Sequence, residues 1–255
     1  GVQWHECSLS KLLENLSYPE VEEYLKKKDI ILVPTGSVEQ HSPYGLFGTD
    51  FITAESVTRR VAEKMDILAA PTVNYGVSPH HMSFKGTVSL SPDTMILLIS
   101  DIIESLATHG FRRIVFINGH GGNISSIKIA MERSKVRMIK GCFHVISWYE
   151  MEEVQKLSAD LFNGQEGHHA TPSEVSITKY LREEAFESKS VQKLQVKNPT
   201  YYWPLTCEEM KKAFPDGRME SAPWLASADY GQKFLEEASR AIQKKIEEIL
   251  LIKLL

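Results

Sequence analysis

Three side chains that can bind metals lie within one short segment, GSVEQHSPYGLFGTD, at residues 36–50. They belong to Glu39, His41 and Asp50. Imidazole and carboxylate ligands suit zinc, iron or manganese. In an extended segment, side chains two residues apart point the same way, so Glu39 and His41 can project into one crevice. The segment is therefore a candidate part of a metal site.

Asp50 has two interpretations that the residues alone leave open. It stands at the start of a helical pattern, where Asp50 or Thr49 can cap the N-terminus, and capping is the commoner use of Asp at that place. It can also turn back to bind metal. A carboxylate that bridges two cations is chemically natural, because its charge neutralises both.

Two later segments add further donors: NGHGGN at residues 118–123, which contains His120, and EGHHATPSEVS at residues 166–176. The second contains His168, His169 and Glu174. Two metal ions need about six protein ligands with at least one of them shared. One set meets that need if its aspartate bridges: Glu39, His41, Asp50, His120 and Glu174. His169 is then free to transfer protons. On the residues alone, scattered structural side chains around an ordinary α/β sheet remain an equal alternative.

Hydrophobic periodicity predicts the elements that must position these residues. Apolar runs predict strands at residues 29–36, 66–76, 112–119 and 141–150. Helical spacing and capping signals predict helices at residues 50–65, 91–110, 123–140, 171–185 and 230–250. This alternation implies a mostly parallel sheet covered by helices. Ligands of such sheets bind beyond the carboxyl ends of the strands, where the first two donor segments lie.

The size of the chain suits one large α/β domain or two small ones. It has 255 residues, of which 42% are hydrophobic and 24% charged. No linker is visible, so we predict a single domain over residues 1–255. The hydrophobic periodicity of the sequence weakens at residues 187–229, where four prolines occur. We therefore predict a loop-rich cap there.

Charge, hydropathy and cysteine usage argue against several classes of protein. The formal net charge is -4, and no basic stripe interleaved with aromatic residues suggests a nucleic-acid partner. The apolar stretches are shorter than the roughly 18 to 20 residues that span a bilayer. The three cysteines, Cys7, Cys142 and Cys207, have no metal-like spacing and suit free thiols in a reducing compartment. We therefore expect a cytoplasmic protein without a membrane partner.

Four motifs follow one another along the chain: PTGSVEQH with a following GTD, SPHHMSFKGTVSL, NGHGGN and HHATPSEVS. In this order and spacing they resemble the motifs of the creatininase (creatinine amidohydrolase) family, and weaker similarity continues through ASADYGQKFLEEA at residues 226–238. The resemblance implies a single-domain three-layer α/β/α sandwich with a mostly parallel sheet. It also implies a metal-dependent hydrolase of a small-molecule substrate that forms a homo-oligomer, often a hexamer.

The resemblance further implies two divalent ions per chain, zinc, manganese or iron. Glu39, Asp50 and His120 match the ligands of one ion. His41 and the same Asp50 match ligands of the second ion, so the resemblance favours the bridging interpretation of Asp50.

The last ligand of the second ion differs among family members. In creatininase it is a glutamate two residues after the histidine of NGH, where this chain has Gly122. The matching alternative is Glu174, in the place of the glutamate of the family's HAGxxE pattern. Thr171 replaces the glycine of that pattern. These departures argue against creatinine as the substrate.

Such a site supports hydrolysis of a C–N bond in an amide or cyclic amide. Two ions lower the pKa of a shared water, so that hydroxide is the nucleophile, and they polarise a carbonyl oxygen. We expect His169 to protonate the leaving nitrogen, although it can instead be a hydrogen-bonding neighbour of the ligands. We expect Asn123 to donate to an oxyanion.

Four residues are predicted to contact the substrate. Gly121 and Gly122 would let the backbone come close to the metals, with a plain glycine-rich turn as the alternative. His81 falls where the family has a histidine in HxxFxGT. Trp148 lies within the fourth predicted strand and can shield a small polar ring, or fill the core instead.

The shared motifs do not separate an amidohydrolase from other members of the family. Such members hydrolyse cyclic polyol ketones, deformylate formamidopyrimidine intermediates or trim a modified peptide. A binding protein that kept the fold and lost catalysis is a further class. The complete ligand set argues against it.

Overall fold

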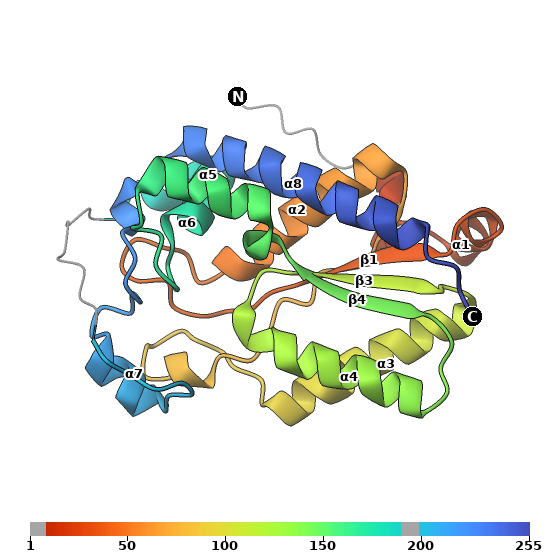
Figure 1. The fold of residues 1–255 in the computed structure, drawn as a ribbon, viewed down its shortest axis with the longest axis horizontal. Helices are drawn as coiled ribbons and strands as arrows, with labels where there is room; N and C mark the ends of the chain where they lie inside the picture. Colours follow the sequence, from red (N-terminus) through yellow and green to blue (C-terminus); the bar gives the residue numbers. More distant parts are fainter. Residues whose placement is uncertain (1–8, 190–198) are drawn as a thin grey trace.

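A parallel sheet of four strands in the order β2-β1-β3-β4 runs through the computed structural model, which describes residues 9–189 and 199–255 (Figure 1). The strands are β1 (Ile30–Thr35), β2 (Leu68–Ala69), β3 (Arg113–Asn118) and β4 (Cys142–Ser147). All four predicted strands are present. β2 is much shorter than the predicted residues 66–76, because the N–H of Ala70 donates to the carbonyl of Leu32 but the next donor on β1 would be Pro34, which has no N–H.

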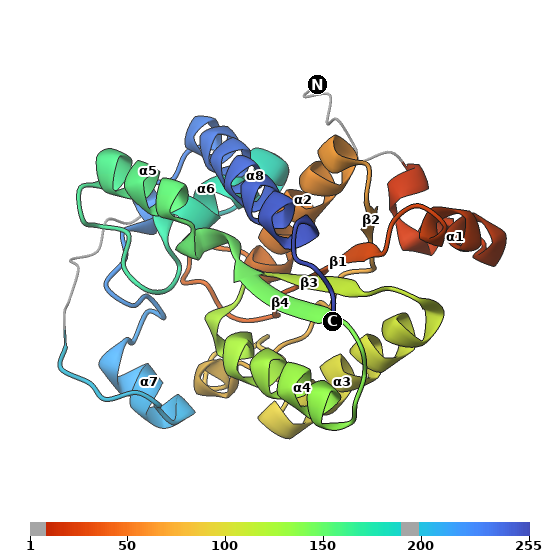
Figure 2. The ribbon, with the colours of Figure 1, turned by 45° about the vertical axis from the view of Figure 1, so that its right-hand side comes forward.

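Helices cover both faces of the sheet, as the mostly parallel α/β/α prediction requires. α2 (Thr49–Met65), α5 (Glu152–Phe162), α6 (Pro172–Leu181) and α8 (Ala228–Leu250) lie on one face (Figures 1 and 2). α3 (Pro92–His109) and α4 (Ile124–Val136) cover the other face. The five predicted helices are confirmed. Three more were not predicted: α5, α1 (Tyr18–Leu25) and α7 (Cys207–Ala213).

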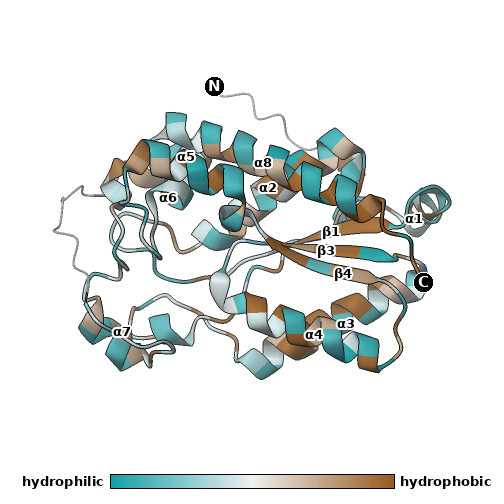
Figure 3. Cartoon of the chain, viewed as in Figure 1, coloured by the Kyte–Doolittle hydropathy of each residue, from teal (hydrophilic) through white to brown (hydrophobic). Residues whose placement is uncertain are grey.

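The strands divide the apolar core into two layers, because successive side chains point to opposite faces of a sheet. Ile30 and Leu32 pack with residues of α2 and α8, whereas Ile31 and Val33 pack with residues of α3 and α4. Figure 3 shows the hydrophobic colouring concentrated on the strands and on helix surfaces that face them. Burial on both faces explains why β1 is a continuous apolar run.

The ends of α3 follow the predicted signals. The hydroxyl of Ser91 accepts a hydrogen bond from the backbone N–H of Thr94 at 3.2 Å. Gly110 ends the helix with a φ of 110°, a conformation that suits glycine.

Residues 199–227 contain α7 and long irregular segments, and the loop-rich cap over 187–229 stays a prediction. α7 supplies a small separate core in which Met210, Phe214 and Met219 pack against Phe84. Residues 190–198 of the predicted cap, and Cys7, lie outside the described residues. Cys142 and Cys207 are free cysteines. No helix in the described ranges is long and apolar enough to cross a bilayer.

Candidate metal centre

The carboxyl ends of three strands meet at one edge of the sheet. Thr35, Asn118 and Ser147 are paired in register at the ends of β1, β3 and β4. The hydroxyl of Thr35 donates to Oδ1 of Asn118 at 2.9 Å, and Nδ2 of Asn118 donates to the hydroxyl of Ser147 at 3.1 Å. This edge carries both the loop that follows β1 and the turn that contains His120, as predicted from the strand order.

Glu39 and His41 project from the β1–α2 loop into the same buried cluster. Their side chains are almost fully buried, and Nε2 of His41 lies 3.9 Å from Oε1 of Glu39. The loop is held by hydrogen bonds from the N–H of Glu39 to the carbonyl of Phe47 and from the N–H of Val88 to the carbonyl of Val38. The prediction that side chains two apart point the same way is confirmed.

Asp50 lies at the centre of this cluster and does not cap α2. Gly48 is the N-cap residue, and no side chain caps there. Oδ1 of Asp50 lies 2.9 Å from Nε2 of His41, and Oδ2 lies 2.9 Å from Nδ1 of His120. The hydroxyl of Ser37 donates to Oδ2 at 2.7 Å. The carboxylate therefore connects two histidines from different loops, and the capping interpretation is wrong.

Glu174 completes one side of the cluster from the first turn of α6. Its Oε1 lies 3.3 Å from Nε2 of His41. Its Oε2 accepts a hydrogen bond from the N–H of Thr171 at 2.8 Å, and the hydroxyl of Thr171 accepts from the N–H of Glu174. This capping box orients the carboxylate. The threonine that departs from the family pattern is therefore the N-cap residue of α6.

Among the described residues, three groups of side chains could each hold a cation. Within each group, three donor atoms lie within 4.8 Å of one another. Two of them share Asp50, and these are Glu39–Asp50–His120 and His41–Asp50–Glu174. They have the composition of the two ligand sets that the family resemblance implied. The third is Glu39, His81 and His169.

The ionisable side chains of the cluster shift one another's pKa values, because they are buried close together. Burial alone would lower the pKa of His41, but the nearby charges of Asp50 and Glu174 raise it well above its usual value. The pKa of His120 is likewise raised well above its usual value, because Glu39 and Asp50 outweigh its burial. Burial raises the pKa of Glu39 to about 7. Asp50 keeps a pKa well below its usual range, because the two histidines outweigh its burial.

Two buried atoms of the cluster lack a hydrogen-bond partner, Oε2 of Glu39 and Nε2 of His41. Carboxylate oxygens lie close to Nε2 of His41, but none is placed for a hydrogen bond. Unsatisfied buried polar atoms are costly, and atoms of this kind are the usual ligands of zinc, manganese and iron. The residues present therefore fit divalent cations.

The other ring nitrogens of the two ligand histidines are already engaged. Nδ1 of His41 lies 3.1 Å from the carbonyl of Glu39, and Nε2 of His120 lies 2.7 Å from the carbonyl of Val77. A carbonyl only accepts, so these nitrogens carry the hydrogens. The nitrogens that face Asp50 are then the ones able to bind a cation, an arrangement typical of metal-binding histidines.

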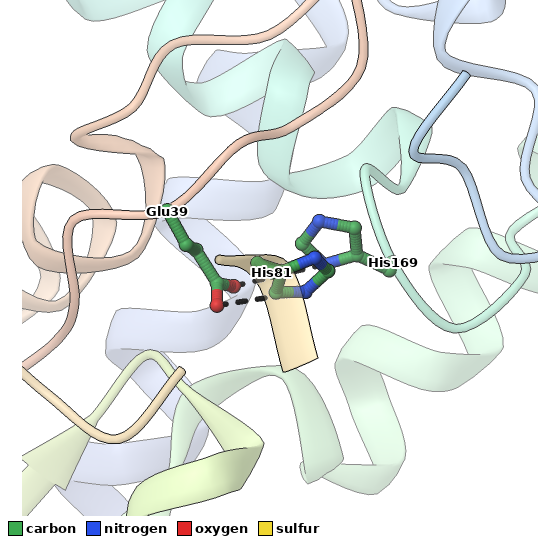
Figure 4. Close-up of side chains that lie close together, drawn as sticks. All are labelled: Glu39, His81 and His169. Atoms are coloured by element: carbon green, nitrogen blue, oxygen red, sulfur yellow. Dashed lines mark ion pairs between the residues drawn. The ribbon is translucent and has the colours of Figure 1, made fainter. Parts of the chain in front are cut away.

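His169 and His81 lie together beside the carboxylate of Glu39 (Figure 4). Nδ1 of His169 lies 3.7 Å from Oε1 of Glu39, and Nε2 of His81 lies 3.6 Å from Oε2. The two rings are stacked, with centroids 4.2 Å apart. His168 points away, and its side chain is 66% exposed and lies near Glu220. The predicted opposite orientation of the two neighbouring histidines is confirmed.

The structure does not support the predicted oxyanion role of Asn123. Its side-chain N–H groups donate to the carbonyl of Gly36 at 2.9 Å and to Oδ1 of Asn118 at 3.3 Å. Its Oδ1 accepts from the N–H of Val77 at 3.0 Å. Because both donors are used within the protein, Asn123 ties together the loops that carry the donors.

The predicted substrate contact of Trp148 is also not supported. Its ring is buried in the core with α2 and α8, and its indole N–H donates to the hydroxyl of Thr53 at 3.2 Å. Its neighbour Tyr149 was not predicted as a site residue. Burial raises the pKa of the Tyr149 hydroxyl, and Asp50 and Glu174 add to the rise. β4 ends at Ser147, and both aromatic residues lie in the 3-10 turn that follows, so strand alternation gave no signal for Tyr149.

The glycines of the NGHGGN turn differ in their surroundings. A Cβ on Gly122 would lie 2.3 Å from the carbonyl oxygen of Val77 and 2.5 Å from Nε2 of His120. Only glycine therefore allows His120 to reach that carbonyl. A Cβ on Gly121 would lie 3.3 Å from the hydroxyl oxygen of Tyr149, so this position faces that hydroxyl.

Comparison with protein families gives one match over nearly the whole chain. The family model Creatininase, described as creatinine amidohydrolase, matches residues 14–246. Creatinine amidohydrolase of Pseudomonas putida is 29% identical over 185 residues, which cover 67% of this chain and 71% of that protein.

Two other relatives match over shorter ranges. Mycofactocin precursor peptide peptidase of Mycolicibacterium smegmatis is 40% identical over 108 residues, 40% of this chain and 43% of that protein. A 3-dehydro-scyllo-inosose hydrolase of Thermotoga maritima is 29% identical over 138 residues, 53% of this chain and 44% of that protein. These two matches therefore span less than half the length of the relatives.

Solved structures agree with the fold. A structure described as creatininase with Mn superposes with a TM-score of 0.83 at 25% identity, covering 95% of this chain and 99% of that one. A mutant creatininase described as Zn-Zn type gives a TM-score of 0.82 at 25% identity, covering 94% of this chain and 98% of that one.

Proposed function

This chain belongs to the creatininase family, and from that premise we propose that it binds two divalent ions per chain and hydrolyses a C–N bond in a small polar amide or cyclic amide. One observation carries the proposal. Asp50 presents its two carboxylate oxygens to two different three-donor groups, one with Glu39 and His120 and one with His41 and Glu174.

Zinc, manganese and iron all suit this mixture of imidazole and carboxylate donors. Divalent ions held there would lower the pKa of a bound water and polarise a carbonyl oxygen. The remaining steps fall to side chains of the protein that are not ligands.

We assign the proton transfer to His169. Its Nε2 donates to the carbonyl of Gln40 at 2.6 Å, so the neutral ring has its lone pair on Nδ1, which faces Glu39. Burial and the neighbouring His41 keep the pKa of His169 well below its usual value, so the ring starts neutral. Nδ1 accepts the proton that the attacking water loses and then gives it to the departing nitrogen. One water is consumed and one C–N bond is broken.

The other activities of the family are the second candidate. The peptidase and the inosose hydrolase named above are similar to this chain over 108 and 138 residues, so a modified peptide or a cyclic polyol ketone is the alternative substrate class. An activity screen over cyclic amides, formamides, short peptides and cyclic polyol ketones, with zinc- or manganese-loaded protein, distinguishes them. Turnover of the ketones alone would overturn the C–N assignment.

The two-ion site is tested first by elemental analysis. Protein purified without chelator and saturated with zinc or manganese should hold two ions per chain. A limit of one ion at saturation would contradict the shared-carboxylate site. The protein should be measured as purified and after dialysis, so that loosely held metal is not counted.

Asp50→Ala is expected to be the most damaging ligand change. Of the two groups that contain Asp50, this change removes a donor from both, whereas Glu39→Ala or Glu174→Ala removes a donor from one. We expect Asp50→Ala to lose both ions under conditions in which Glu174→Ala keeps one. Normal affinity for both ions in Asp50→Ala would show that this carboxylate does not bridge.

A further inference from the structure

Gln40 lies between the two histidines that face Glu39, and both bond to it. Its backbone carbonyl accepts the hydrogen bond from Nε2 of His169. Its side-chain amide nitrogen lies 2.8 Å from Nδ1 of His81. Gln40 is itself buried, so these contacts are shielded from water.

Two backbone contacts determine which way the Gln40 amide points. Oε1 accepts the N–H of Ser42 at 2.8 Å, and Nε2 donates to the carbonyl of Gly217 at 2.9 Å. If the amide were turned over, oxygen would face the Gly217 carbonyl and the amide N–H groups would face the N–H of Ser42. The second hydrogen of Nε2 must therefore point at His81. Nδ1 of His81 is then an acceptor.

The amide has room for this orientation because residue 217 is a glycine. Gly217 has a φ of 86°, and a Cβ there would lie 2.0 Å from Oε1 of Gln40. Any larger residue at position 217 would push the Gln40 amide away from His81 and from its backbone partners at Ser42 and Gly217.

The two stacked histidines therefore present different groups to Glu39: His81 presents an N–H, and His169 presents a nitrogen lone pair. A neutral imidazole carries one hydrogen, so His81 has it on Nε2, which faces Oε2 of Glu39 at 3.6 Å. His169 has its lone pair on Nδ1, which faces Oε1 at 3.7 Å. A nitrogen that carries a hydrogen cannot bind a metal, so the third donor group is not a third cation site.

We propose that Gln40 is a positioning residue that sets His81 as a hydrogen-bond donor and His169 as a proton acceptor toward the reacting atoms at the metal centre. The inference rests on the proposed function and deepens it. His81 donates to the oxyanion that forms on the substrate, the role that Asn123 cannot fill because both its donors are used.

The inference is tested first on the unaltered protein by ¹⁵N NMR of histidine side chains. Long-range ¹H–¹⁵N correlations distinguish a protonated from a bare ring nitrogen, and His81→Gln identifies the His81 signals. We expect His81 to carry its hydrogen on Nε2 in both zinc-loaded and metal-free protein. A hydrogen on Nδ1 of His81 would overturn the inference, whether or not the protein hydrolyses anything.

Gln40→Glu should move the ring hydrogen of His81 from Nε2 to Nδ1. A carboxylate only accepts, so Nδ1 of His81 would carry the hydrogen and Nε2 would become bare. His169 is the internal control, because its partner is the backbone carbonyl of residue 40, which the substitution keeps. If Gln40→Glu does not fold, Gln40→Met is used, and loss of the single His81 form is expected. An unchanged His81 spectrum in the folded variant would overturn the inference.

The consequence for binding is measured with acetohydroxamate, an anionic metal-binding probe. Calorimetry on zinc-loaded protein should show binding to the uncharged variant Gln40→Met weakened roughly tenfold to a hundredfold, as expected for loss of a hydrogen bond to a charged group. Thr87→Val is the matched control, since the hydroxyl of Thr87 accepts a hydrogen bond from the backbone N–H of Gln40 and not from its amide. Equal loss in both variants would overturn the inference. Zinc content, measured alongside, separates this result from failure of the metal site.

Discussion

At the scale of single residues, His169 and His168 are neighbours with opposite surroundings. His169 is buried beside Glu39, and His168 is exposed near Glu220. We expect His169→Ala to keep its metal content and to lower kcat by roughly a hundredfold to ten-thousandfold, the usual span for acid–base groups. His168→Ala is the control and should change neither the metal content nor kcat. Loss of one ion from His169→Ala, or a larger defect in His168→Ala, would reverse the assignment.

The two ligand histidines predict how metal affinity depends on pH. In metal-free protein the pKa values of His41 and His120 are raised well above their usual value of 6.5, so both rings hold protons that a cation must displace. Zinc affinity should therefore keep rising with pH above 6.5 and fall as pH falls. Zinc titration of chelator-treated protein at several pH values, with proton release followed in weak buffer, measures this. Affinity independent of pH between 6 and about 8 would contradict it.

Single residues were predictable where motif spacing specified them. Glu39, His41, Asp50, His120 and Glu174 lie together because loop ends of a parallel sheet converge. Asn123, Trp148 and Tyr149 were not assigned correctly, because their roles depend on partners far away in the sequence. No local pattern shows that the Trp148 indole meets Thr53 of α2, or that the Asn123 amide reaches Gly36.

At the scale of elements, the start of α2 is pressed against the end of β3. A Cβ on Gly119 would lie 2.2 Å from the carbonyl oxygen of Asp50. Gly119→Ala should push the first turn of α2 outward, which moves Asp50, lowers metal affinity and destabilises the fold by about 1–3 kcal/mol. Gly121→Ala is the matched control in the same turn, because its nearest neighbour would be 3.3 Å away. Urea unfolding and zinc titration compare the two variants, and equal effects would contradict this account.

Boundary signals at both ends made α3 predictable, whereas α1 and α7 carry capping boxes at Ser17 and Thr206 and were not predicted. α3 has a Ser cap, a proline at its start and a closing glycine, so its ends followed from the sequence. The end of β2 did not follow from the sequence in this way. Its ladder has two residues because its pairing with β1 stops there. α7 has seven residues, so its periodicity is too brief to separate from loop. Length does not explain why α5 was missed, because its 11 residues exceed the 10 of the predicted α6.

At the scale of the whole molecule, the proposed ligands come from segments more than a hundred residues apart. The β1–α2 loop, α2, the turn after β3 and α6 each contribute, so bound ions would link both halves of the described chain. The single domain over residues 1–255 and the homo-oligomer stay predictions. Sedimentation velocity of metal-loaded protein tests the oligomer, and a monomer at micromolar concentration would contradict it.

Because the ligands span the fold, metal binding should stabilise the entire chain. A ligand present at a hundred times its Kd adds about 2.7 kcal/mol to the free energy of unfolding if it binds only the folded state. In a chain of this size that corresponds to a rise in Tm of roughly 5–10 °C. We therefore expect zinc to raise the Tm of chelator-treated protein by this amount in scanning calorimetry, and Asp50→Ala to show almost no rise. Gly121→Ala keeps every ligand and should respond as the unaltered protein does. A Tm of the unaltered protein that zinc leaves unchanged would mean that the ions are not held by these segments together.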